Sequence, residues 1–199
     1  MLGFYKEAGE IYRLEVPFER IYTSVFLIDG KEAKILLDCA TTSEDVDRYI
    51  VPALNELGYG LSEIDAIVIS HKHEDHAGGL KRITELAPNI RVISDATYPL
   101  PQGLSIYPLP GHTGNCIGIF DESTHTLISA DGIQCAGIDK YPCSLKDPHA
   151  YSETLAKVKN DKRIENILFS HAYEPFNENR CLGRENVIKC IEFCENYSK

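Results

Sequence analysis

The sequence lacks three features that would each indicate a particular class of protein. No apolar run approaches the ~20 residues that an α-helix needs to cross a bilayer. Residues 1–7 lack the basic and then apolar pattern of a secretory signal peptide. Lysine and arginine (20) are outnumbered by aspartate and glutamate (30), and they form no basic stripe that would attract nucleic-acid phosphates. We therefore expect a cytoplasmic protein that binds neither membranes nor nucleic acids.

The seven cysteines lack the pattern of a disulfide or zinc-binding framework. Their number is odd, and no two of them are arranged as C-x-x-C. Such cysteines fit reduced thiols in a cytosol, where they are commonly small core residues. We expect no catalytic or metal-binding role for them.

Length and composition indicate an ordinary globular protein. Of the 199 residues, 43% are hydrophobic and 25% are charged, which is typical of a folded chain rather than a disordered or fibrous one. The length suits one domain with a substantial core. We therefore predict a single domain over residues 1–199.

Apolar periodicity predicts an α/β protein that opens with antiparallel strands. Strands are expected at 11–16, 21–28, 34–38, 65–70, 90–94, 104–108, 116–120, 126–130 and 166–170. Helices are expected at 43–57, 76–86, 149–159 and 183–196. The segment 133–148 has no such pattern, and a loop of this length in a compact domain is usually functional.

The densest group of metal-binding side chains is the H-K-H-E-D-H segment at 71–76, directly after a predicted strand. An extended backbone sends alternate residues to one side, so His71, His73 and Asp75 converge. Imidazole and carboxylate suit zinc and related divalent metals. His76 is adjacent to Asp75 and must aim elsewhere, which is a first indication of two metals. The alternative is a histidine cluster with a purely structural role.

Four further candidates come after other predicted strands. Asp38, Asp131 and His171 stand where apolar strands end, and His112 lies in a turn after Pro110-Gly111. Strand ends of one sheet arrangement can meet at one edge, so these residues can share a site. Taken alone, His112 and His171 are better explained as surface or core histidines, and only their order behind the 71–76 segment favours a ligand role. The alternative for Asp38 is a strand-end cap.

The two remaining histidines do not fit this pattern. His125 is in a predicted hairpin turn and His149 is at the start of a predicted helix. We expect both to be structural.

In their order along the chain, these motifs resemble those of the metallo-β-lactamase superfamily over almost the whole length. The motifs are Leu37-Asp38, H-x-H-x-D-H at 71–76, Gly-His-Thr-Gly at 111–114, Ala130-Asp131 and Ser170-His171. The resemblance implies an αββα four-layer sandwich of two mixed β-sheets with outer helices. It is specific for the fold and the site rather than for the substrate.

The resemblance also implies a set of metal ligands. One ion would be bound by His71, His73 and His112, and the other by Asp75, His76 and His171, with Asp131 bridging them. Asp38 would hold ligands in orientation, a role that metal sites commonly need. The implied cofactors are two divalent metal ions, zinc first, with iron and manganese as alternatives.

The chemistry implied by this resemblance is hydrolysis. A hydroxide that bridges the two metals would attack a small ester, thioester or lactone, and Asp75 could also accept or pass on a proton. Tyr141, in the long loop, and Tyr173, just after His171, are candidates to contact the substrate or a developing oxyanion. The alternative for each tyrosine is packing.

Departures from the patterns of individual members narrow the choice. Flavodiiron proteins usually carry Glu where this chain has His73, and most true β-lactamases replace the acid supplied here by Asp131. Glyoxalase II enzymes add a helical C-terminal domain, and the lactonase-like members are nearest in size. The last motif is Ser170-His171-Ala172 rather than Gly-His-Gly, which changes the pocket wall.

Two rival functions remain. A persulfide dioxygenase-like enzyme would use one iron on His71, His112 and Asp131. A non-catalytic metal-binding or partner-binding domain would be expected to have lost a ligand, and none is lost here.

Overall fold

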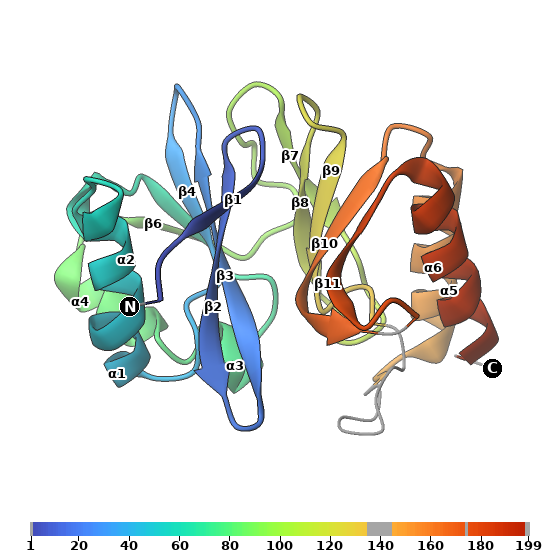
Figure 1. The fold of residues 1–199 in the computed structure, drawn as a ribbon, viewed down its shortest axis with the longest axis horizontal. Coiled ribbons are helices and arrows are strands. Elements are labelled where there is room, and N and C mark those ends of the chain that lie inside the picture. The colour runs from blue at the N-terminus through green and yellow to red at the C-terminus, as the bar shows by residue number, and fades with distance from the viewer. Residues whose placement is uncertain (1, 135–144, 174, 198–199) are drawn as a thin grey trace. The chain divides into compact units, whose positions relative to one another are not determined.

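The computed structural model describes residues 2–134, 145–173 and 175–197. The chain divides into two compact units, Met1–Ser94 and Asp95–Lys199. Each unit contains one mixed β-sheet and the helices that pack on it (Figure 1). The predicted class of two mixed sheets with helices is confirmed, whereas the single domain over 1–199 stays a prediction.

The first sheet has six strands in the order β1-β2-β3-β4-β5-β6. Their bounds are Tyr5–Ala8, Ile11–Phe18, Ile21–Asp29, Lys34–Leu37, Ala66–Val68 and Arg91–Ile93. The first four strands pair antiparallel, as predicted for the opening of the chain, and β4, β5 and β6 pair parallel. Strand β1 was not predicted because its four residues show no apolar alternation.

The helical stretch after β4 agrees with the predicted helix at 43–57. It consists of α1 (Ser43–Asp45), the π-helical turn η1 (Val46–Ile50) and α2 (Val51–Glu56). Thr42 and Asp45 form a capping box at its start, which satisfies backbone N–H groups that have no helical partner. Gly58, with φ of 88°, follows its end. Figure 1 shows α1 and α2 on one face of the first sheet, where apolar helix and strand residues form one core.

The predicted continuous helix at 76–86 is wrong. The chain forms two short helices, α3 (Glu74–Ala77) and α4 (Leu80–Leu86), separated by Gly78 and Gly79. A Cβ on Gly78 would lie 1.8 Å from the Thr41 carbonyl oxygen, and one on Gly79 would lie 2.1 Å from that of Cys39. The two glycines therefore allow this backbone to press against the loop after β4. The unit also contains a 3-10 turn, η2 (Leu61–Glu63).

The second sheet has five strands in the order β11-β10-β9-β8-β7. In chain order from β7, their bounds are Leu104–Pro108, Ile117–Asp121, Thr126–Ala130, Asn166–Tyr173 and Glu178–Leu182. Strands β9 and β10 pair parallel, and β8 pairs antiparallel with both β7 and β9. Strands β7, β9 and β10 therefore run in the same direction and end at the same edge. The prediction ended β10 at 170, three residues short, and did not include β11.

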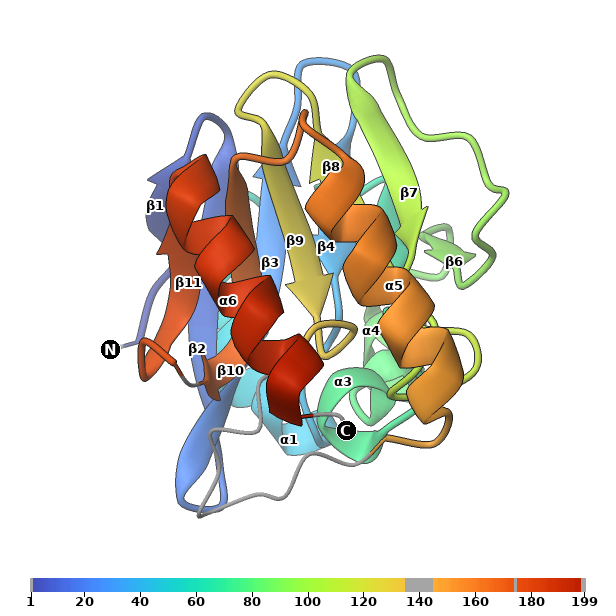
Figure 2. The same cartoon turned by 90° about the vertical axis from the view of Figure 1, so that its right-hand side faces the viewer.

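Two long helices cover one face of the second sheet, as Figures 1 and 2 show from two directions. They are α5 (Pro148–Asn160) and α6 (Arg184–Tyr197), both close to the predicted bounds. Asp147 caps α5 by accepting from the backbone N–H of Ala150 at 3.0 Å. On α6, Val187, Cys190, Ile191 and Cys194 are buried in the core of this unit.

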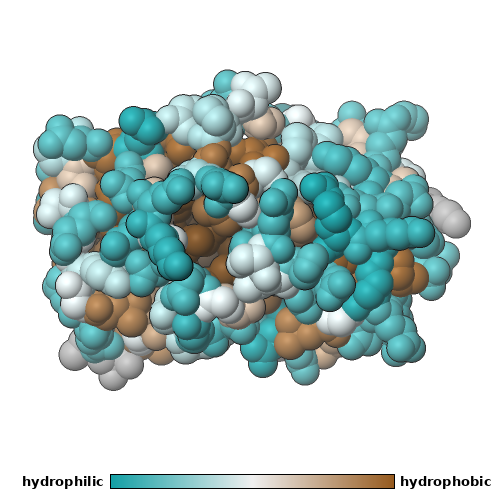
Figure 3. Space-filling model, turned by 90° about the horizontal axis from the view of Figure 1, so that it is seen from above, coloured by the Kyte–Doolittle hydropathy of each residue, from teal (hydrophilic) through white to brown (hydrophobic). Residues whose placement is uncertain are grey.

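Within the described ranges, no helix is long and apolar enough to cross a membrane. The face of the molecule in Figure 3 carries mostly hydrophilic residues, with separate apolar areas between them.

Candidate metal centre

In the first unit, the candidate ligands follow the ends of two neighbouring parallel strands. Leu37 of β4 pairs with Val68 of β5, and the next residue, Asp38, donates its backbone N–H to the Val68 carbonyl at 2.9 Å. Asp38 has φ of 66°, a conformation uncommon for a residue other than glycine. This local turn brings the carboxylate beside the segment that follows β5.

The Asp38 carboxylate is the centre of a buried hydrogen-bond network. Its Oδ1 accepts from the Ser70 backbone N–H at 2.8 Å, and its Oδ2 accepts from Ser70 Oγ at 2.8 Å. Nδ1 of His76 lies 2.7 Å from Oδ2 and must donate, because a carboxylate oxygen only accepts. The Asp38 side chain therefore fixes both a strand-end serine and a candidate ligand.

The same network determines which nitrogen of His71 can bind a metal. The single hydroxyl proton of Ser70 goes to Asp38, so the contact of 3.0 Å between Ser70 Oγ and His71 Nδ1 requires Nδ1 to donate. Nε2 then carries the lone pair in His71, as it does in His76. An imidazole whose Nδ1–H is held by a neighbour is the usual form of a metal-binding histidine.

The imidazoles of the first unit converge. The ring centroids of His71 and His73 are 4.5 Å apart, and those of His71 and His76 are 4.2 Å apart. Nε2 of His76 also lies 3.2 Å from Oδ2 of Asp75. The convergence of His71 and His73 is confirmed.

The prediction that an extended backbone brings Asp75 to the same side as His71 and His73 is wrong. The extended backbone of β5 ends at Val68, and both Asp75 and His76 belong to helix α3. The helical turn brings the His76 ring back beside His71 rather than away from it.

The thiol of Cys39 supports α3 rather than offering a ligand. Its backbone N–H and its Sγ both donate to the carbonyl of His76, at 2.9 and 3.2 Å. Burial raises the pKa of this thiol, and the nearby charge of Asp38 raises it further. The thiol is therefore protonated at neutral pH.

In the second unit, candidate ligands again follow strands that end at one edge. Asp131 comes directly after β9, behind Ala130 with φ of 47°. Ala130 pairs with Phe169 of the parallel strand β10, so the following residues of both strands lie together. The prediction that His171 ends its strand is wrong, because β10 continues to Tyr173. His112 lies between β7 and β8, as predicted.

Asp131 lies between the two candidate metal-binding histidines of this unit, His112 and His171. Its Oδ2 is 3.8 Å from His112 Nε2, and its Oδ1 is 3.5 Å from His171 Nε2. Two ligands on one tetrahedral ion lie about 3–4 Å apart when metal–ligand bonds are about 2.0–2.2 Å long. The donor types and spacings therefore fit divalent metal, with a different oxygen of Asp131 facing each histidine.

Two more side chains contact Asp131. Tyr173, predicted as a substrate contact, donates its hydroxyl to Oδ1 at 2.9 Å, and only 4% of its surface is exposed. Gln134, which sequence reasoning missed, donates Nε2–H to Oδ2 at 3.0 Å. The only sequence signal for Gln134 is its position three residues after Asp131. Ser70 was missed as well, although it directly precedes His71.

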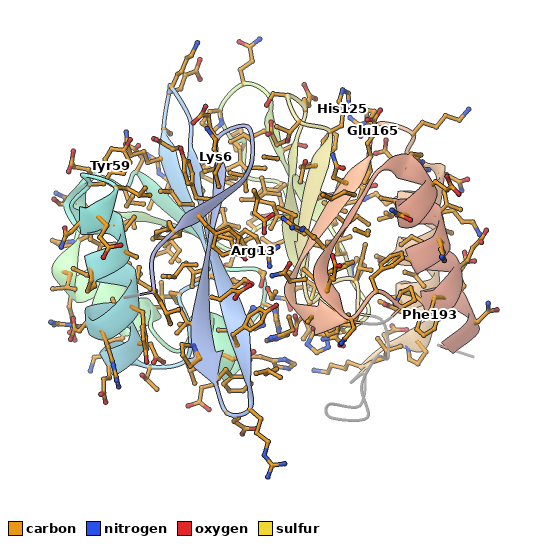
Figure 4. The ribbon with its side chains drawn as sticks, viewed as in Figure 1. Lys6, Arg13, Tyr59, His125, Glu165 and Phe193 are labelled. Atoms are coloured by element: carbon orange, nitrogen blue, oxygen red, sulfur yellow. The ribbon has the colours of Figure 1, made fainter. Side chains whose placement is uncertain are left out.

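The histidines expected to be structural lie away from Asp131. His125 is in the β8–β9 turn, at the opposite end of β9, where its carbonyl accepts from the backbone N–H of Glu165 at 2.9 Å (Figure 4). His149 on α5 has 86% of its side chain exposed. Tyr141, and the part of the predicted loop from 135 to 144, lie outside the described residues.

Two mixed sheets with imidazole and carboxylate groups beyond their strand ends define a metal-binding protein of the α/β class. A sequence model of the metallo-beta-lactamase superfamily matches residues 19–104, which include Asp38 and the segment 71–76. The resemblance to this superfamily that the motifs predicted is therefore confirmed by the match of its sequence model.

Curated relatives include proteins named as hydrolases. A beta-lactamase-like protein 2 homolog of Caenorhabditis elegans is 27% identical over 88% of this chain and 68% of its own length. A hydroxyacylglutathione hydrolase of Legionella pneumophila (strain Lens) is 23% identical over 77% of this chain and 68% of its own length.

Solved structures of similar fold cover nearly the whole chain. A metallo-β-lactamase from Erythrobacter litoralis matches with a TM-score of 0.72 and 18% identity, over 97% of this chain and 96% of that one. AidC, a dizinc quorum-quenching lactonase, matches with a TM-score of 0.64 and 15% identity, over 91% and 93%. At these identities the similarity shows the fold alone.

Proposed function

We propose that this protein is a metal-dependent hydrolase with a dinuclear site that acts on a small ester, thioester or lactone. The observation that carries the proposal is the position of Asp131, with one carboxylate oxygen facing His112 and the other facing His171. A carboxylate so placed is suited to bridge two ions. In the rival dioxygenase site, a single iron on His71, His112 and Asp131 would need only the contact between Asp131 and His112.

The proposed ligands follow the order of the superfamily motifs. One ion would be held by His71, His73 and His112, and the other by Asp75, His76 and His171, with Asp131 shared. The close pairs within each unit support this assignment, because Asp75 and His76 are 3.2 Å apart and the His71 and His73 rings are 4.5 Å apart.

Zinc or a related divalent ion, when bound, supplies a nucleophilic hydroxide near neutral pH and polarises a carbonyl oxygen. The residues of the chain then hold and move protons around this chemistry. Asp38 keeps the Nδ1–H of His76 engaged, so the ring presents Nε2. Asp75 is the carboxylate that we assign to accept or pass on a proton.

The substrate class is supported by the relatives. Their names include hydroxyacylglutathione hydrolase and, among proteins of similar fold, a lactonase. Both names describe acyl-transfer to water on a small molecule. We propose the same reaction type here, with zinc as the first metal and iron or manganese as alternatives.

The first test is metal analysis of protein purified without added metal, followed by assays of the zinc, manganese and iron forms. The substrates are small esters, thioesters, lactones and phosphodiesters. We expect about two metals per chain and hydrolysis that depends on them. About one iron per chain, with oxygen uptake on glutathione persulfide, would overturn the hydrolase proposal in favour of a dioxygenase.

The second test removes one ligand from each unit. We expect His73→Ala and Asp131→Ala to abolish turnover and to lower the metal content. The matched control is His149→Ala, since that side chain is 86% exposed and should change neither quantity. Full activity in a variant that has lost its metal would contradict the mechanism.

A further inference from the structure

We propose that Gln134 and Tyr173 clamp Asp131, one donor on each carboxylate oxygen, and that each donor controls the affinity for a different one of the two metals. The inference rests on the proposed dinuclear site. It concerns residues of the second unit only, and it gives Tyr173 the role of a positioning residue.

The first half of the clamp acts on Oδ1. The Tyr173 hydroxyl donates to this oxygen at 2.9 Å, and the same oxygen lies 3.5 Å from Nε2 of His171. The ring of Tyr173 also contacts the ring of His171 edge to face, with centroids 5.8 Å apart. Loss of the hydroxyl would therefore disturb the oxygen that faces His171.

The second half of the clamp acts on Oδ2. The Gln134 amide donates to this oxygen at 3.0 Å, and the same oxygen lies 3.8 Å from Nε2 of His112. Loss of this amide would therefore disturb the oxygen that faces His112.

Gln134 is itself held in place by Tyr151 of α5. The Tyr151 hydroxyl accepts from the backbone N–H of Gln134 at 2.9 Å and donates to the carbonyl oxygen of the same residue. Tyr151 also packs tightly on Gly111, where an added Cβ would lie 2.5 Å from the Tyr151 Cβ. One buried tyrosine thus positions both Gln134 and the turn that carries His112.

The chemistry of the two donors suits this role. An amide and a phenol are both neutral, so they orient Asp131 without offsetting the negative charge that a cation requires. An ionised carboxylate has about four acceptor positions, and the clamp occupies one on each oxygen. Carboxylates that bind metals are usually hydrogen-bonded by neighbouring groups in this way as well.

The experiment titrates the metal-free protein with Co²⁺ and follows visible absorption and binding heat. The test variants are Tyr173→Phe and Gln134→Met, and the matched controls are Tyr107→Phe and Gln102→Met. Tyr107 is a buried tyrosine of the same unit that bonds Asp161 rather than Asp131, and Gln102 is exposed. His171→Ala and His112→Ala provide the reference spectra for loss of each ion.

We expect each test variant to weaken one binding step by about 10–100-fold, as the loss of a partner of a metal ligand usually does. Tyr173→Phe should reduce the same cobalt absorption as His171→Ala, and Gln134→Met the same absorption as His112→Ala. Gln134→Asn, which keeps the amide but shortens its reach, should behave as Gln134→Met and replaces it if that variant does not fold. Near-UV circular dichroism of the metal-free variants checks the fold.

Each contrary result has a distinct meaning. If the variants bind two cobalt ions as tightly as the wild type, the clamp is overturned and the dinuclear site stands. If both variants weaken the same step, the assignment of one donor to each ion is overturned. If the wild type binds fewer than two ions, the proposed function is overturned and the clamp with it.

Discussion

Asp38 and His76 form a buried pair in which Oδ2 of the carboxylate lies 2.7 Å from Nδ1 of the imidazole. The two side chains are 1% and 0% exposed. Ser70 donates twice to the same carboxylate, once from its backbone and once from its hydroxyl. Asp38 therefore supports a candidate ligand and the end of β5 at once.

The contact between Asp38 and His76 predicts that Asp38→Ala lowers both the stability of the fold and the metal affinity. The buried N–H of Ser70 would lose its acceptor, which costs about 1–3 kcal/mol in the free energy of unfolding. Metal affinity should fall about 10–100-fold, because the His76 ring is no longer oriented. Denaturant unfolding of the metal-free protein measures the first effect, and metal titration the second.

The control for that substitution is Asp95→Ala. Asp95 also accepts from a backbone N–H, that of Thr97 at 2.8 Å, but it is exposed. We expect no change in metal affinity there. Unaltered metal affinity in Asp38→Ala itself would remove Asp38 from the site.

Gly79→Ala tests the close approach between α4 and the loop after β4. The added Cβ would lie 2.1 Å from the Cys39 carbonyl oxygen and 2.6 Å from Cγ2 of Val46. The Cys39 carbonyl belongs to the backbone and cannot move away without distorting the loop. We therefore expect the free energy of unfolding to fall by about 1–3 kcal/mol or more. Gly60→Ala is the control, because its new Cβ meets only the side chains of Glu63 and Ser62 at 3.5 Å or more. Equal stability of the two variants would contradict the packing argument.

Arg13 on β2, labelled in Figure 4, forms a buried ion pair with Glu7. Nε of Arg13 lies 2.5 Å from Oε1 of Glu7, and Nη1 donates to Ser24 Oγ at 2.9 Å. The guanidinium also lies 4.6 Å from the centre of the Phe26 ring. Burial lowers the pKa of Arg13, and the charge of Glu7 opposes that shift.

Removal of one charge from this pair should be costly. We expect Arg13→Met to lower the free energy of unfolding by about 3–5 kcal/mol, because Glu7 keeps a buried charge. The double variant Arg13→Met with Glu7→Leu should recover most of that loss. Denaturant unfolding of the wild type, Arg13→Met and the double variant tests the coupling.

The control for the ion pair is Arg82→Met. Arg82 pairs with Asp47 at 2.9 Å, but the two side chains are 32% and 50% exposed. An exposed pair contributes about 0–1 kcal/mol. If Arg13→Met costs no more than Arg82→Met, the buried pair is not a stability determinant.

The raised pKa of Tyr107 predicts that the stability of the protein falls at alkaline pH. Burial, with a further contribution from the charge of Asp161, raises the pKa of Tyr107 to about 12. The unfolded chain ionises this hydroxyl near about pH 10, so the unfolded state loses the proton first and stability falls between about pH 10 and 12. Below that range the contribution is fully present.

The measurement compares urea unfolding of the wild type and Tyr107→Phe at about pH 9 and pH 11. We expect the wild type to lose more stability than the variant over this interval, because the variant lacks the group. Other tyrosines are common to both proteins and contribute equally. Identical losses would show that Tyr107 titrates alike in the folded and unfolded states.

The local pattern of apolar residues predicted helices and strands well where a segment was long or strongly apolar. The predicted helix at 183–196 and strand at 126–130 lie within a residue of α6 and β9 at their ends. The break at Gly78-Gly79 was missed because it depends on Thr41 and Cys39, which are distant in the chain. Strand β11 was missed because its pairing with β10 decides it.

The sequence by itself indicated the candidate ligands, their order and the resemblance to the superfamily, because imidazole and carboxylate groups at short spacing after apolar strands are local features. Only the tertiary structure decided how those groups are held. Tyr173 reaches Asp131 from 42 positions away in the chain, and His76 reaches Asp38 from 38 positions away. Such contacts depend on which strands run parallel and end at one edge, and strand pairing is a property of the folded sheet rather than of any one segment.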